Sequence, residues 1–122
     1  MSLRENDIDL KRLKSKYAIE QLFADGTVLN SKHLIFRLMK ESEGQAFYAG
    51  VSVSKRNFKK AVDRNRIKRQ LRVALKTHEN NLSFPGNGML IFKARKALST
   101  LAIIEETKSL LENCNEWNSS QT

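Results

Sequence analysis

Apolar and polar residues alternate along several stretches of the chain, and this period of two predicts β-strands. The clearest case is 45–54, where one face is apolar and holds Phe47, Ala49, Val51 and Val53. Another strand is predicted over 33–41, and because only 42–44 separate the two, we expect an antiparallel hairpin. A third strand, 88–94, has an unbroken apolar centre, which indicates an interior position in the sheet.

Apolar residues at spacings of three and four predict helices on both sides of these strands. The first covers 16–24, with Ser15 as its N-cap and Gly26 at its end. The last begins after Ser99 and Thr100. Its apolar side holds Ile104, Thr107, Leu110, Leu111 and Cys114. Its polar side, which we expect to face water, holds Glu105, Glu106, Lys108 and Glu112.

Both ends of the chain are polar. Residues 1–14 contain few apolar side chains, so we expect a mobile arm of which only the last few residues dock. Residues 115–122 are expected to fray. At 122 residues the chain has the length of one ordinary domain, and we interpret 1–122 as a single domain.

A helix with a high density of positive charge is predicted over 57–78, between the strands at 45–54 and 88–94. With about 100° of rotation per residue, one arc of this helix is apolar and would face the core. This arc comprises Ala61, Ile67, Leu71, Ala74 and Leu75. An arc beside it, which we call the cationic strip, comprises Arg64, Asn65, Lys68, Arg69, Arg72 and Lys76. Arg66 lies outside both arcs, and we expect it to bond to the neighbouring strand or loop.

The positive charge of the chain is concentrated in this helix and the turn before it. The chain has 22 Lys and Arg against 13 Asp and Glu, a net charge of +9. Residues 55–76 hold ten of the basic residues and a single acid, Asp63, so the remaining positions are formally neutral. The cations of the preceding turn are Lys55, Arg56, Lys59 and Lys60. Such a cluster without interleaved glutamates predicts a polyanionic partner and excludes an acidic scaffold.

Several classes of protein and of site are excluded. A single cysteine, Cys114, and an N-terminal segment without an apolar core exclude a secreted disulfide-bonded module. The longest apolar runs have four residues, whereas crossing a membrane takes about 20. Neither His33 nor His78 has an evident triad partner, Cys114 is expected to be buried and inert, and no zinc-ligand spacing is present. We therefore predict no catalytic side chain and no metal bound by the protein.

The segments GVSVSKR at 50–56 and AVDRNRIKR at 61–69 resemble the protein component of bacterial ribonuclease P. The likeness extends from about Lys14 to Leu111. It implies an α+β fold, an α/β sandwich in the order αβββαβα, with a four-stranded sheet and a left-handed β-α-β crossover. Because only three strands are evident, the fourth would be a short piece at the end of 51–55.

The resemblance also implies a function. In this family the RNA subunit is the catalyst and uses Mg²⁺ to cut precursor tRNA at the mature 5′ end, while the protein binds that RNA and the 5′ leader of the substrate. The expected partners are these two RNAs in the cytoplasm, with no DNA, no membrane and no cofactor bound by the protein alone. The residues that match the family's RNA-contacting signature are Arg64, Asn65, Arg66, Lys68, Arg69 and Arg72.

The resemblance places the leader in a cleft between the sheet and the first helix, where aromatic side chains stack on unpaired bases. Phe23 matches one of these aromatics, whereas Ile19 and Arg37 stand where some relatives have others. A guanidinium at Arg37 can lie over a base face in place of a ring. Without the resemblance, Phe23 would be interpreted as a core residue of an amphipathic helix.

Two other classes of function fit parts of the pattern. A plain nucleic-acid binder, such as a small ribosomal protein or a helix-turn-helix regulator, needs only a basic helix, although a lone helix flanked by strands disfavours the regulator. A basic helix lying on anionic lipid is disfavoured because few bulky apolar residues adjoin the cationic strip. Acceleration of tRNA 5′ processing by the protein would separate a ribonuclease P subunit from a plain binder.

Overall fold

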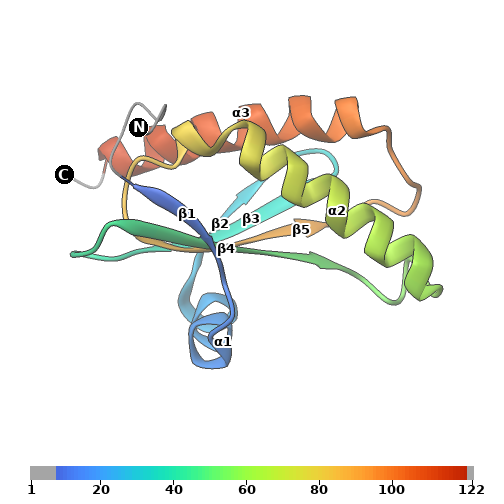
Figure 1. Cartoon of the computed structure of the whole chain (residues 1–122), viewed down its shortest axis with the longest axis horizontal. Coiled ribbons are helices and arrows are strands. Elements are labelled where there is room, and N and C mark those ends of the chain that lie inside the picture. The colour runs from blue at the N-terminus through green and yellow to red at the C-terminus, as the bar shows by residue number, and fades with distance from the viewer. Residues whose placement is uncertain (1–7, 121–122) are drawn as a thin grey trace.

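The chain forms a mixed sheet with helices on both faces (Figure 1). The computed structural model describes residues 8–120. The elements, in chain order, are β1 (Asp9–Arg12), α1 (Lys16–Asp25), β2 (Thr27–Asn30), β3 (Leu34–Lys40), β4 (Ala46–Val53), α2 (Ala61–Thr77), the 3₁₀ turn η1 (Glu79–Asn81), β5 (Gly86–Phe92) and α3 (Thr100–Ser120). Helices α2 and α3 pack together on one face of the sheet, and α1 packs against the other (Figure 1).

The strands lie in the order β1-β4-β5-β3-β2, so β5 is central, as its apolar sequence predicts. It pairs parallel with β4 and antiparallel with β3. The predicted hairpin between 33–41 and 45–54 is therefore wrong: both strands form, but β5 lies between them. Their connection passes over the start of β5, where the Glu41 N–H donates to the Pro85 carbonyl at 3.0 Å and Gly44 adopts a φ of 125°. The central place goes to β5 because it is apolar on both faces.

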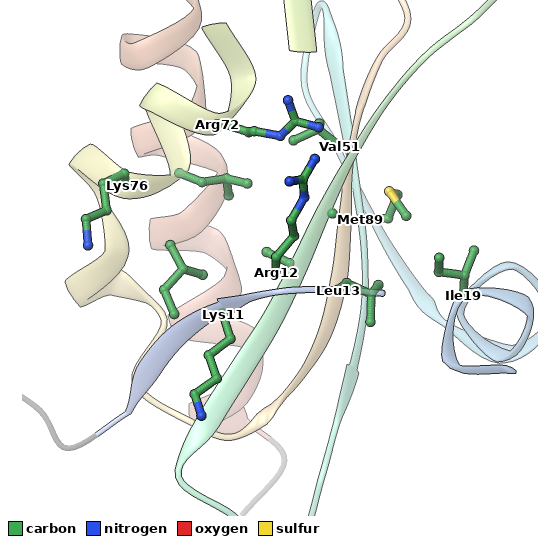
Figure 2. A pocket seen from close by; sticks show the side chains of 12 residues that line it. Lys11, Arg12, Leu13, Ile19, Val51, Arg72, Lys76 and Met89 are labelled. Atoms are coloured by element: carbon green, nitrogen blue, oxygen red, sulfur yellow. The ribbon is translucent and has the colours of Figure 1, made fainter. Parts of the chain in front are cut away.

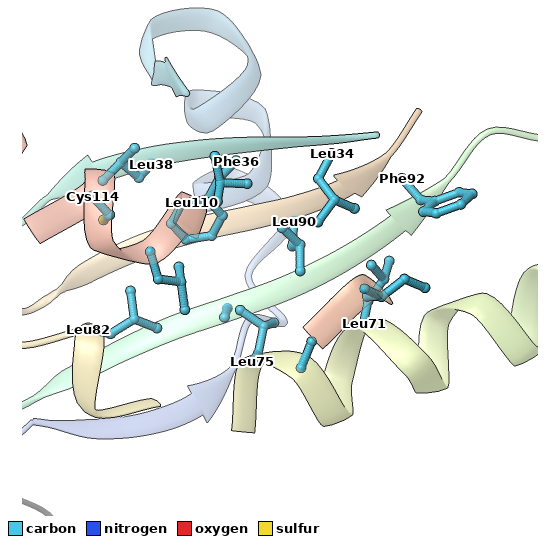
Figure 3. Close-up of a cluster of buried hydrophobic side chains, with 14 of the residues drawn as sticks. Leu34, Phe36, Leu38, Leu71, Leu75, Leu82, Leu90, Phe92, Leu110 and Cys114 are labelled. Atoms are coloured by element: carbon cyan, nitrogen blue, oxygen red, sulfur yellow. The ribbon is translucent and has the colours of Figure 1, made fainter. Parts of the chain in front are cut away.

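The main hydrophobic core fills the space between the sheet and the layer of α2 and α3 (Figure 3). The predicted alternation in β4 is confirmed, since Phe47, Ala49 and Val53 are buried on this side. Gly88 leaves room for two rings, because a Cβ there would lie 2.6 Å from Cζ of Phe36 and 2.9 Å from Cε1 of Phe47. The rings of Phe36 and Phe47 accordingly stack, with centroids 6.1 Å apart.

Helix α1 is capped by Ser15 and Gly26 as predicted, and it runs one residue further than predicted, through Asp25. The Ala18 N–H donates to Oγ of Ser15 at 3.2 Å, and the Gly26 N–H donates to the Leu22 carbonyl at 3.0 Å. The fully buried side chain of α1 is Leu22, which belongs to a small cluster on the face of the sheet opposite the main core. That cluster consists of Leu13, Leu22 and Met89. This contact leaves most of α1 exposed to solvent.

The short strands β1 and β2 are absent from the sequence prediction. β1 pairs parallel with the first half of β4, ending with Arg12 opposite Ala49. The predicted docking of the last residues of the 1–14 arm is confirmed, but it extends back to Asp9, so 9–12 form a strand instead of a mobile segment. Residues 1–7 lie outside the described part of the chain. The interpretation of 51–55 as an additional strand is also wrong, because β4 runs through Val53 and the strand missing from the prediction is β2. Strands of four residues show too little alternation to be recognised.

From α1 to α3 the elements follow the expected order αβββαβα, and β1 precedes them. The α+β class is confirmed, although the sheet has five strands instead of four. The β-α-β unit consists of β4, α2 and β5, whose strands are parallel neighbours. Its left-handed crossover stays a prediction.

Helix α3 extends further than predicted. Because it continues to Ser120, the expected fraying of 115–122 is wrong for 115–120, and 121–122 lie outside the described residues. Trp117 packs against the core, with the centroid of its ring 6.0 Å from that of Phe84. Burial of the apolar Trp117 ring contributes free energy that offsets the conformational entropy lost when the last turn of α3 is ordered.

Glu106 on α3 binds the loop between β2 and β3 instead of facing water as predicted. Its carboxylate accepts hydrogen bonds from the Ser31 hydroxyl and from the His33 N–H at 2.7 Å, and it lies 2.7 Å from Nδ1 of His33. Burial alone would raise the pKa of Glu106, but these hydrogen bonds hold it below its ordinary value. The predicted apolar side of α3 is confirmed for Thr107, Leu110, Leu111 and Cys114, which are buried. Ile104 is only partly buried, and Ile103, which the prediction omits, is fully buried.

Replacing Glu106 with glutamine should reduce stability near neutral pH. Since the pKa of Glu106 is lower in the folded chain than its ordinary value of 4.5, its contribution is present above that pH and is lost as the pH falls through the folded pKa. We expect Glu106→Gln to cost about 1.5 to 3 kcal/mol at neutral pH, the range for hydrogen bonds to charged groups, and little in acid. Urea unfolding across pH measures this, with Glu112→Gln, an exposed carboxylate on α3, as the control. A loss of stability that is the same at every pH would contradict the prediction.

Candidate RNA interface

Helix α2 carries the predicted positive charge on the side that the core leaves free. It begins at Ala61, later than predicted, and Ala61 is exposed instead of buried. The rest of the predicted apolar arc is buried and consists of Ile67, Leu71, Ala74 and Leu75. Gln70 is buried beside them, with Nε2 donating to the Leu98 carbonyl at 3.1 Å and to Oγ1 of Thr100 at 3.0 Å. These contacts fix the rotation of α2 about its axis.

All six residues of the cationic strip reach solvent. Arg64 and Lys68 are half-buried, and the exposed members are Asn65, Arg69, Arg72 and Lys76. Within residues 8–120, the only ion pair of the strip joins Lys76 Nζ to Glu79 Oε2 at 3.2 Å. The strip therefore lies along one side of α2, and apart from Lys76 its cations are not paired with a carboxylate of residues 8–120, so most of its charge is available to a partner.

Arg64 and Arg66 exchange the roles expected from the sequence. Nη1 of Arg64 donates to the carbonyls of Phe58 and Lys59, both at 2.8 Å, and so braces the turn before α2. Arg66, for which we expected a local bond, is exposed and makes no hydrogen bond or ion pair with residues 8–120. That expectation is wrong, because the backbone carbonyls that need a donor lie beside Arg64. Arg66 is thus open to a ligand, and part of Arg64 serves the fold.

The turn between β4 and α2 adds a second group of cations. Its members Lys55, Arg56, Lys59 and Lys60 are all exposed. Nδ2 of Asn57 donates to the carbonyls of Lys93 and Ala94 at 3.3 and 3.4 Å, which holds the chain after β5 against this turn. Arg56, Asn57 and Arg95 line a shallow hollow of about 280 Å³. Arg95 is absent from the predicted interface, although the basic residues that follow β5 in the sequence could have indicated it.

A larger groove of about 380 Å³ opens where β1 ends (Figure 2). β1 pairs with β4 only as far as Ala49, so β4 beyond that point has a free edge, and the chain turns away toward α1. The groove has a cationic side lined by Lys11, Arg12, Arg72 and Lys76. Its apolar lining includes Leu13, Ile19, Val51 and Met89. Gly50 contributes no side chain, and a Cβ there would lie 3.0 Å from Cε of Met89.

The three residues expected to bind the leader lie near one another on the α1 face of the sheet. Ile19 lines the groove. Phe23 is 46% exposed, which excludes the interpretation as a core residue. The Arg37 guanidinium carbon lies 5.1 Å from the centroid of the Phe23 ring, and its Nη1 donates to the Phe23 carbonyl at 3.3 Å. Arg37 and Phe23 therefore form one stack, and Tyr48, 40% exposed, is an aromatic that the sequence prediction omits.

The groups considered for catalysis are engaged in the fold. The expected burial of Cys114 is confirmed, and this burial raises the pKa of its thiol to about 12, which disfavours the reactive thiolate. Nε2 of His78 lies 3.1 Å from the Ile104 carbonyl, and His33 contacts Glu106. Among residues 8–120, no three His, Cys, Asp or Glu side chains are grouped so that they could hold a metal ion. No helix in the same part of the chain is long and apolar enough to span a membrane.

A family model for ribonuclease P matches residues 9–115, nearly the whole described chain. The chain belongs to the ribonuclease P protein family. The match begins at β1, earlier than the likeness noted from the sequence alone. It includes the cationic strip, the turn before α2 and every residue that lines the groove.

Individual ribonuclease P proteins are similar in sequence and in fold. The ribonuclease P protein component of Listeria innocua is 32% identical over 100 residues, which cover 82% of each chain. That of Halalkalibacterium halodurans is 34% identical over 107 residues and 86% of each chain. The Staphylococcus aureus RNase P protein superposes with a TM-score of 0.73 at 25% identity, over 84% of this chain and 94% of that one. The Thermotoga maritima protein has the same fold, with a TM-score of 0.73 at 18% identity.

Proposed function

We propose that this ribonuclease P subunit binds the catalytic RNA through α2 and the turn before it, and binds the 5′ leader of precursor tRNA along the groove. In this proposal the protein holds enzyme and substrate RNA together and thereby assists removal of the leader. The RNA subunit breaks the phosphodiester bond with Mg²⁺, and the participation of that ion in the holoenzyme stays a prediction.

The observation that carries the proposal is the continuity between the cationic strip and the groove. Arg72 and Lys76 belong to both, since they are members of the strip and line the groove. From there the groove leads past Leu13 to Ile19 on α1 (Figure 2). An RNA strand along this path meets cations first and apolar surface next, which suits a strand whose bases are unpaired.

A folded RNA would use the rest of the basic surface. Outside the groove lie Lys55, Arg56, Lys59, Lys60, Arg64, Asn65, Arg66, Lys68 and Arg69. Lysines offer point charges and arginines offer planar forks to phosphates, and neither needs unpaired bases. Asn65 carries no charge, so its amide suits a base edge or a ribose hydroxyl among the phosphate contacts. We assign this surface to the catalytic RNA.

The decisive experiment measures tRNA 5′ processing at low Mg²⁺ with the cognate catalytic RNA, with and without the protein. We expect the protein to accelerate cleavage of precursor tRNA and to cleave nothing by itself. If turnover by the RNA is unchanged by the protein at every salt and Mg²⁺ concentration, the proposal fails. RNA binding without acceleration would instead identify a plain nucleic-acid binder.

Replacing Phe23 with alanine should weaken binding of precursor tRNA to the complex of protein and catalytic RNA. The exposed ring and the Arg37 guanidinium over it offer a surface on which an unpaired base can stack, and such stacking contributes about 1 to 3 kcal/mol per base. Mature tRNA, which lacks a leader, should bind the Phe23→Ala complex as it binds the wild type. Tyr17→Ala serves as the control, because Tyr17 is a 69% exposed aromatic of the same helix, and among residues 8–120 no guanidinium stacks on its ring as Arg37 does on that of Phe23. An equal loss for mature and precursor tRNA would contradict a leader contact at Phe23.

A further inference from the structure

Two arginines from distant parts of the chain converge at the groove. Arg12 ends β1, Arg72 lies in the second half of α2, and both line the groove. Figure 2 shows their guanidinium groups approaching each other beside β4, whereas the ammonium groups of Lys11 and Lys76 extend away from them. Neither arginine makes a hydrogen bond or an ion pair with any residue of 8–120. Two like charges are thus held together without a compensating carboxylate.

The proximity of these two like charges has an electrostatic cost. Partial burial, and next the positive charge of Arg12, lower the pKa of the Arg72 guanidinium below its ordinary value. The Arg72 guanidinium nevertheless stays charged near neutral pH, because an arginine in a protein is not deprotonated there. An anion between them would turn the repulsion into two attractions, and the planar forks of both arginines match the oxygens of a phosphate.

The rest of the groove indicates the kind of anion. Beyond the arginines the lining becomes apolar, with Leu13, Ile19 and Met89, and the missing side chain of Gly50 leaves space over β4. A phosphate between the arginines would therefore have room for an attached base on the apolar side. The volume of about 380 Å³ lies in the range of pockets that enclose small ligands. Bases within a duplex are stacked and paired, so a nucleotide of single-stranded RNA fits this site and a double helix does not.

We propose that Arg12 and Arg72 together bind one phosphodiester of a single RNA strand, with the adjoining base on the apolar side of the groove. The inference rests on the proposed function and adds Arg12, which the predicted interface lacks. It also changes the assignment of Arg72, which acts jointly with Arg12 on a single phosphate instead of binding a phosphate of its own. Strand β1 thereby has a role in the interface, because it brings Arg12 to α2.

The test compares wild type with Arg12→Gln, Arg72→Gln and the double variant. The affinity of each protein for catalytic RNA carrying bound precursor tRNA is measured over a series of KCl concentrations. A phosphate contact with a single strand contributes about 0.7 to the slope of log K against log salt. If the arginines share one phosphate, the double variant loses about 0.7 in total and each single variant loses less, because the other arginine still neutralises that phosphate.

Two results would overturn the proposal. Losses of about 0.7 in each single variant and about 1.4 in the double variant would indicate two separate phosphates. Slopes equal to that of the wild type in all three variants would indicate that no phosphate is bound there. Lys108→Gln, an exposed cation of α3, is the control for a loss of net charge, and Arg12→Lys should keep the slope because it keeps the charge. Thermal unfolding of every variant verifies that the fold is retained, and amide hydrogen exchange of Asp9–Arg12 verifies that β1 remains paired with β4.

The same titrations show which RNA supplies the single strand, and they test the proposed function separately. A shared loss of slope seen with precursor tRNA but not with mature tRNA identifies the leader as the strand. A shared loss seen with catalytic RNA alone identifies an unpaired segment of that RNA, and both results support the site. If the wild type itself binds none of these RNAs, the proposed function fails, whereas normal binding with independent arginines removes only this inference.

Discussion

A protein in which Lys59, Lys60 and Lys68 are all replaced by glutamine should bind ribonuclease P RNA about 100-fold more weakly at 0.1 M salt. Each of these side chains reaches solvent, and none is paired with a carboxylate of residues 8–120. A lysine that neutralises a phosphate contributes about 0.7 to 0.9 to the salt slope, so the triple substitution should reduce that slope by about 2 to 3. Dissociation constants over a series of KCl concentrations measure both quantities.

A matched control distinguishes RNA binding at a defined surface of the protein from a general attraction of RNA to its net positive charge. Replacing Lys32, Lys40 and Lys108 removes the same charge from exposed positions outside α2 and the turn before it. We expect this variant to keep nearly the wild-type slope, since no phosphate contact is lost. An equal reduction in both triple variants would mean that the net charge of +9, and not the position of the lysines, attracts RNA. Asn65→Ala should weaken binding with an unchanged slope, because an uncharged amide releases no counterion.

Replacing Leu71 with alanine should destabilise the fold by about 2 to 5 kcal/mol. Leu71 is fully buried, and it packs in the core that joins α2 to the sheet (Figure 3). The cost combines the lost transfer of apolar surface out of water with the cavity that neighbouring side chains cannot fill. Because the same helix carries the cationic strip, the variant should lose RNA affinity as it approaches its unfolding midpoint. Urea unfolding followed by circular dichroism measures the stability.

The control for Leu71→Ala lies on the same helix. Val73 is 47% exposed, so Val73→Ala should change the stability by no more than about 0.5 kcal/mol. Both variants should show the wild-type salt slope at low denaturant, because neither removes a charge. A loss at Leu71 no larger than that at Val73 would show that the α2 face of the core contributes little to stability.

The long periodic segments could be predicted from the sequence because each pattern repeats often enough to exclude other structures. The alternation from Phe47 to Val53 gave β4, and the apolar residues of the basic segment gave the buried side of α2 with the exception of Ala61. The cationic strip followed from the same rotation, since residues beside a buried arc must reach solvent. Family resemblance added the order of elements from α1 to α3.

Strand pairing, by contrast, depends on contacts between distant segments. The spacing of three residues between the β3 and β4 segments favours a hairpin, yet the buried centre of the sheet goes to β5 because it is apolar on both faces. β1 and β2 are too short to show a pattern, and neighbouring strands satisfy their backbone hydrogen bonds. Glu106 has the sequence context of a surface residue. It instead binds the loop between β2 and β3, because α3 brings its carboxylate to Ser31 and His33.

The sequence by itself determined the family signature, the class of fold and the concentration of positive charge on one helix, because these depend on residue types and spacings within single segments. Only the tertiary structure decided that Arg12 faces Arg72, that Arg64 rather than Arg66 braces the turn, and that Arg37 covers Phe23. Each of these contacts joins residues whose proximity depends on strand register, strand order or the path of a loop. Their free energies are shared among many packed neighbours, so no local pattern reports them.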